Sequence, residues 1–186
     1  MRFILSVMLM GAGLSIAGVT NAAEEPSACG VLSEKDAVAV TGGSLGEVYK
    51  HEVKAAAENG NDHDTECGYF PKGYNLEKAE APPERGLMIT LHTMRSKSDA
   101  KRFYDRLFDM AKQSGAAQPG TKIAPVSGLG EAAYLELIKF DPKSNQELAN
   151  IGFLKGNVMG FMQLWLRRPP GDTAQAAAKQ IISKLP

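Results

Sequence analysis

The sequence predicts an α+β fold, in which a largely antiparallel sheet is packed by two to three helices within a single domain. Two observations lead to this prediction. Strand patterns follow one another through short turns, and strands joined in that way cannot be parallel neighbours. Capped amphipathic helix patterns interrupt and close the series of strands, an order typical of helices packed on an antiparallel sheet.

The first 22 residues have the features of a secretory signal peptide. Arg2 precedes an apolar stretch from Phe3 to about Val19, and small residues follow it. We expect cleavage after Ala22, with cleavage after Ala23 as the alternative. A membrane anchor fits less well, because the apolar stretch is short and contains three glycines. Residues 23–186 are then a single α+β domain that is periplasmic or secreted, with no stable membrane insertion after cleavage.

The charge balance excludes one class of partner. The chain has 21 basic and 21 acidic residues and no basic run. A near-neutral chain of this kind has no electrostatic footprint for nucleic acid.

The chain has two cysteines, Cys29 and Cys67. An even number of cysteines in an exported protein favours a disulfide over free thiols. In the loop-entropy description such a bond stabilises the fold by about 4 kcal/mol at most. A redox-active pair is the alternative, but such pairs normally have the spacing Cys-x-x-Cys.

The first predicted element is a short helix that Ser33 caps and Gly42 ends in a left-handed turn. A strand is predicted over 46–54, although its periodicity is weak. The polar stretch that follows, which includes DHDTE at 62–66, has the composition of a solvated acidic turn. A short strand, CGYF, is predicted after it at 67–70.

Residues 86–94 show the clearest strand pattern, with apolar residues alternating along the segment. Ser96 then caps the strongest amphipathic helix, which we expect to end at Gly115. Three strands joined by hairpins follow, and the third, VMGFMQLWL, is apolar on both faces, as in an interior strand. The three strands cover 132–140, 147–154 and 158–166. Asp172 is expected to cap the last helix, which follows them.

No catalytic constellation is evident in the sequence. GLGEAA at 128–133 fits the glycine fingerprint of dinucleotide sites, but a strand pattern follows it where the fingerprint needs a helix. Ser127 lacks the glycines of a nucleophile elbow. The carboxylates Glu136, Asp141 and Glu147 are interpreted as solvated hairpin charges. We therefore predict no cofactor and favour a non-catalytic role.

One metal-site alternative stays open. Met88, His92 and Met94 share one face of the strand at 86–94, and thioether and imidazole ligands suit Cu(I). The methionines and the tryptophan of another predicted strand could add to this face: Met159, Met162 and Trp165. Packing in an irregular core is the competing interpretation of these methionines.

Several short motifs together resemble small exported bacterial proteins of unknown function, many of them lipoproteins. The motifs are the cysteine before VLSEKDAVAVTGG, CGYF, VSGLGEAAY with its GLG-E-x-A-Y turn, the hairpin GFLKGNVMGFMQL and the terminal AAAKQIISKL. The resemblance implies a helix-packed antiparallel sheet and a cysteine pair, here Cys29 and Cys67. Cys29 lies too far beyond the apolar stretch to be a lipid-modified residue, so the resemblance does not imply a tether.

The leading hypothesis is an exported, non-catalytic module that binds a small molecule or a partner protein. Two alternatives belong to other classes of function. One is a periplasmic copper-handling protein that uses Met88, His92 and Met94. The other is a hydrolase with an unrecognised site, for which His92 is the first residue to test.

Overall fold

The computed structural model describes most of the chain beyond the predicted signal peptide. The described residues are 25–46, 48–53, 61–76, 78–79, 81–139, 146–167 and 171–186. The predicted signal peptide at 1–22 lies outside them, as does Asp141.

Seven strands and four helices make up the described chain. The helices are α1 (Ala28–Val31), α2 (Glu34–Thr41), α3 (Lys97–Ala117) and α4 (Gly171–Ser183). The strands are β1 (Tyr49–Val53), β2 (Asn61–Tyr69), β3 (Gly86–Met94), β4 (Lys122–Pro125), β5 (Ala132–Lys139), β6 (Glu147–Lys155) and β7 (Val158–Leu166).

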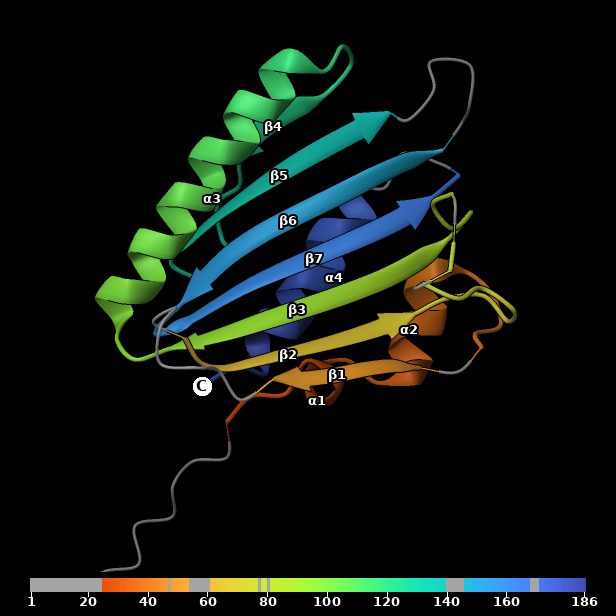
Figure 1. Ribbon diagram of the computed structural model, residues 1–186, viewed down its shortest axis with the longest axis horizontal. Helices are drawn as coiled ribbons and strands as arrows, with labels where there is room; N and C mark the ends of the chain where they lie inside the picture. Colours follow the sequence, from red (N-terminus) through yellow and green to blue (C-terminus); the bar gives the residue numbers. More distant parts are fainter. Residues whose placement is uncertain are drawn as a thin grey trace, which may run out of the picture.

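All seven strands form one sheet in the order β1-β2-β3-β7-β6-β5-β4. Every pairing is antiparallel. Figure 1 shows the helices as two unequal layers: α3 lies in front of the sheet and crosses one end of it, whereas α4 lies behind. The predicted α+β class with an antiparallel sheet is confirmed, and β7 is an interior strand as its two apolar faces predicted.

The main core lies between the sheet and the layer formed by α1, α2 and α4. Alternate residues of each central strand point into it, as the period of two requires. The fully buried side chains that the sheet contributes include Ile89, Leu91, Ile151, Phe153, Met162 and Leu164. The predicted apolar stripe of the last helix is buried against them, since Ala178, Ile181, Ile182 and Leu185 all lie in this core.

The predicted disulfide between Cys29 and Cys67 is present, with its two Cα atoms 5.1 Å apart. It joins α1 to β2 near the end of that strand. Two further contacts fasten the same segment to this strand: the Ala28 amide donates to Thr65 Oγ1 at 2.9 Å, and the Tyr69 hydroxyl donates to the Leu32 carbonyl at 2.5 Å. The short α1, which the sequence did not predict, is therefore held by tertiary contacts.

The caps of the two predicted N-terminal and central helices form as expected. Ser33 accepts from the Asp36 amide and Ser96 accepts from the Asp99 amide, so each serine satisfies a free donor in the first turn of its helix. The prediction that Gly115 ends α3 is wrong. The helix runs on to Ala117, and Gly115 instead provides space, because a Cβ there would lie 2.5 Å from Ile123 Cδ1 on β4.

The largest difference from the sequence prediction is at β2. The acidic stretch at 62–66, expected to be a solvated turn, is strand paired with both β1 and β3. His63, Thr65 and Cys67 are buried on the face toward α1, while Asp64 and Glu66 alternate with them on the other face. These residues have a low strand propensity, but such a propensity is weak and depends on context. The hydrogen-bonded pairing of β2 with β1 and β3 outweighs it.

Candidate functional site

A groove of about 430 Å³ lies between α3 and the sheet. Because α3 crosses only one end of this face, the strands next to it remain open (Figure 1). Three α3 side chains form the wall: Phe103, Leu107 and Ala111. The floor comes from four strands and includes Glu66, Met88, Thr90, Glu136, Phe161 and Gln163.

A row of three polar side chains crosses three adjacent strands, and its two outer members line the floor of the groove. Glu136 on β5, Asn150 on β6 and Gln163 on β7 face one another in register. The Asn150 amide donates to Glu136 Oε2 at 2.7 Å, and the Gln163 amide donates to Asn150 Oδ1 at 3.4 Å. Glu136 is 8% exposed and Asn150 is 5% exposed. We call these three residues the polar row.

An aromatic cluster fixes α3 to the sheet beside this row. Phe108 stacks on Tyr134 with ring centroids 5.0 Å apart, and Tyr104 lies 5.8 Å from the same ring. Tyr134 in turn lies against Gly152, where a Cβ would be 2.3 Å from its Cε1 atom. Burial raises the pKa of Tyr104 to about 12 and raises that of Tyr134 as well. Of these aromatic side chains, Tyr134 lines the groove.

His92 lines the groove near the start of α3. Its Nδ1 lies 2.9 Å from Asp64 Oδ1, and its ring packs edge-on against Phe103 at 5.3 Å. A carboxylate that orients an imidazole is also part of a catalytic triad, which further requires a hydroxyl or thiol hydrogen-bonded to the imidazole. Within the described residues His92 has no hydrogen bond to a hydroxyl or thiol, so the contact between nucleophile and base is not formed.

No protein-family model matches this sequence, and no curated protein matches it either. A solved structure with a similar fold is the extracellular domain of PknH from Mycobacterium tuberculosis. The TM-score is 0.57 at 12% sequence identity, over 83% of this chain and 92% of that one. A likeness at this identity shows the fold alone. The two chains therefore share a fold.

The three residues of the copper alternative pack in different surroundings. Residues four apart on an extended strand have their Cα atoms about 13 Å apart, so Met88 and His92 are not adjacent on this face. Met94 is 2% exposed and packs under α3, whereas Met88 packs toward Phe70 and Trp165. Met162 points into the main core on the opposite face. In this structure the methionines fill apolar space.

Sequence reasoning missed the residues that give the groove its polarity. Glu136 was interpreted as a solvated hairpin charge, and that interpretation is wrong, since it is buried beside Asn150. Glu147 is paired with Lys139 at 3.3 Å at the end of the same hairpin. A signal was present: Glu136, Asn150 and Gln163 are each a polar residue between apolar neighbours on the same strand face. The order of the strands, which the sequence does not reveal, was needed to join them.

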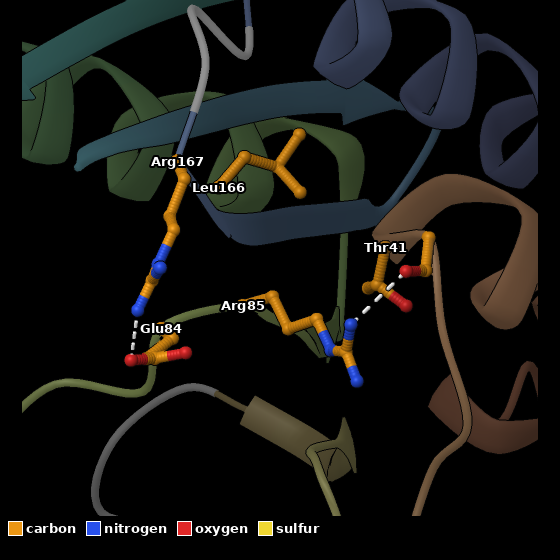
Figure 2. Close-up of a pocket in the computed structure, with 6 residues that line it drawn as sticks. Thr41, Glu84, Arg85, Leu166 and Arg167 are labelled. Atoms are coloured by element: carbon orange, nitrogen blue, oxygen red, sulfur yellow. Dashed lines mark hydrogen bonds and ion pairs between the residues drawn. The ribbon is translucent and has the colours of Figure 1, made fainter. Parts of the chain in front are cut away.

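A second cavity, of about 410 Å³, has two arginines in its lining, as Figure 2 shows. Arg167 points toward Glu84 and forms an ion pair with it. Arg85 points the other way, where its Nη1 donates to the Gly42 carbonyl at 3.1 Å. The two guanidinium groups diverge, so they do not form a common anion site.

No helix in the described parts of the chain is long and apolar enough to cross a membrane.

Proposed function

We propose that this protein is an exported, non-catalytic module that binds a small, largely apolar molecule in the groove under α3. The observation that carries the proposal is the groove itself. Its volume of about 430 Å³ lies within the range of small-molecule sites. Its walls are mainly apolar and aromatic, with a few polar groups placed on the floor, which is the usual composition of such sites.

The assignment to an exported protein has three supports. Residues 1–22 read as a signal peptide. The bond between Cys29 and Cys67 is of a kind that persists in oxidising compartments. A protein domain of similar fold is described as extracellular.

A small molecule fits the groove better than a partner protein does. Stable protein interfaces bury about 800 Å² on each partner and have exposed apolar anchors at their centre. Here the apolar side chains lie inside a concavity between α3 and the sheet, and Met110 is the one large apolar side chain among the described residues that is markedly exposed.

The test uses two tryptophan substitutions one residue apart on α3. Ala111→Trp places a large ring in the groove wall, whereas Met110→Trp changes the outward face, where Met110 is 51% exposed. N-phenyl-1-naphthylamine, a neutral apolar dye that fluoresces when buried, serves as the probe. We expect saturable binding by the wild type and by M110W, and at least about a tenfold loss of affinity in A111W.

Two results would reject the proposal. One is dye binding that A111W leaves unchanged, with both variants folded by circular dichroism. The other is turnover of a tested substrate that a single substitution abolishes, for example at His92, since that would make the protein an enzyme.

A further inference from the structure

The floor of the groove holds a buried carboxylate without a positively charged neighbour. Glu136 is 8% exposed, and its hydrogen-bond partner is the neutral amide of Asn150. Among the described residues, no lysine, arginine or histidine forms an ion pair with it. Burying a carboxylate is costly unless a cation compensates for the lost hydration. The groove next to Glu136 is where such a cation would sit.

A second carboxylate lies at the other end of the same groove. Glu66 on β2 is half-buried and lines the floor. Four strand-to-strand steps, through β3, β7 and β6, separate β2 from β5, which places the two glutamates roughly 20 Å apart at their Cα atoms. Of the described residues that line the groove, none is a lysine or an arginine.

The stretch between these two carboxylates is mainly apolar. Phe161 and Met88 form its floor, and Phe103 and Leu107 form the wall above. His92 also lines the groove, and its ring is paired with Asp64. Negative groups at the two ends and apolar surface between them match a molecule with the opposite distribution of charge.

We propose that the occupant of the groove is a linear organic dication, of the diamine or polyamine class, with one ammonium group at Glu136 and the other at Glu66. This inference rests on the proposed function and specifies its ligand. Each ammonium forms a charge-assisted hydrogen bond, which is shorter and stronger than one between neutral groups. The aromatic rings favour the same ligand, since cations are attracted to ring faces. Anionic molecules are excluded by repulsion from both glutamates.

The experiment compares three ten-carbon compounds by isothermal titration calorimetry on the mature protein: 1,10-diaminodecane, decylamine and 1,10-decanediol. We expect the diamine to bind at least about tenfold more tightly than decylamine, and the diol to bind more weakly than both. Glu136→Gln and Glu66→Gln should each reduce diamine affinity to about that of decylamine. Asp105→Asn, which removes a charge from an exposed pair on α3, should leave the affinity unchanged.

The outcomes separate this inference from the proposed function. If the diol binds as tightly as the diamine and A111W abolishes both, the groove binds small molecules but the dication is wrong. If E66Q, at a half-buried position where the fold is not at risk, leaves diamine affinity unchanged, the two-ended arrangement is wrong. If none of the three compounds binds, the dication is again wrong. The naphthylamine result for the wild type and A111W then decides the proposed function by itself.

Discussion

The side-chain amide of Asn150 donates a 2.7 Å hydrogen bond to Glu136 Oε2 across the β6–β5 pair. Both residues are more than nine-tenths buried. A buried hydrogen bond to a charged group contributes more than one between neutral groups, and removing one partner leaves the other unsatisfied. Asn150 therefore supports both the stability of this face and the position of the carboxylate in the groove.

The first prediction concerns this pair. Asn150→Leu should lower the free energy of unfolding by about 1–3 kcal/mol, because Glu136 keeps its burial and loses its donor. The double variant Asn150→Leu/Glu136→Leu should regain part of that loss, since replacing both partners by apolar groups removes the unsatisfied charge. Urea unfolding followed by circular dichroism measures both values.

A surface ion pair serves as the control for these stability measurements. Lys101→Ala breaks an exposed ion pair with Asp105 and should cost less than about 0.5 kcal/mol. Equal stability of N150L and wild type would contradict the prediction, as would a double variant that is no more stable than N150L.

The second prediction concerns the covalent link from α1 to β2. Cys29→Ser/Cys67→Ser should lower the free energy of unfolding by about 2–4 kcal/mol, mainly by releasing a constraint on the unfolded chain. Thermal unfolding with and without dithiothreitol provides the measurement and its control. The reductant should lower the melting temperature of the wild type and leave the double variant unchanged. A wild type whose melting does not respond to complete reduction would show that the link contributes little.

The second half of the fold was predictable from sequence because its signals are local. The alternation at 86–94 predicts β3, and the serine cap with the amphipathic repeat after it predicts α3. Both patterns are formed by residues close in sequence. β2 was missed because its strand conformation comes from neighbours far along the chain. Cys67 pairs with Lys50 on one side and Ile89 on the other, and no local pattern in a run of acidic residues reports those contacts.

The groove was not predictable for a related reason. β3 is paired with β7, with Leu91 opposite Gly160, although α3 and three strands separate them in sequence. That long crossover brings Glu66 to the same floor as Glu136. The sequence gives the local surroundings of each glutamate, but the order of the strands is needed to show that both glutamates line one groove.

The third prediction is a loss of stability at alkaline pH. Burial raises the pKa values of Tyr69, Tyr104 and Tyr134, that of Tyr104 to about 12. In the unfolded chain these phenols ionise near pH 10. Their contribution to stability is therefore complete below about pH 10 and is lost as the pH rises through the folded pKa values. Urea unfolding at pH 8, 10 and 11 should show the decline, and absorbance of tyrosinate at 295 nm should appear together with unfolding.

Phenylalanine substitution identifies the groups responsible for this decline. Tyr104→Phe/Tyr134→Phe removes two of the buried phenols, so the fall in stability between pH 10 and 11 should become shallower. A decline as steep in this variant as in the wild type would show that other groups cause it.

The fourth prediction compares two glycines in the turn that leads into β5. Gly128 and Gly130 both have positive φ angles, 77° and 65°. Around Gly128 a Cβ would meet nothing within 4 Å, but at Gly130 it would lie 2.3 Å from the Leu154 carbonyl oxygen. That oxygen also accepts from the Glu131 amide at 2.8 Å, so it cannot move away without losing a backbone hydrogen bond.

Gly128→Ala should therefore cost only about 1–2 kcal/mol, the strain of a left-handed alanine. Gly130→Ala should cost about 3 kcal/mol or more, since a backbone clash adds to the same strain. Urea unfolding measures both, and hydrogen exchange at the Glu131 amide should accelerate in G130A but not in G128A. Similar costs for the two variants would show that conformational strain alone, and not close approach to β6, requires glycine in this turn.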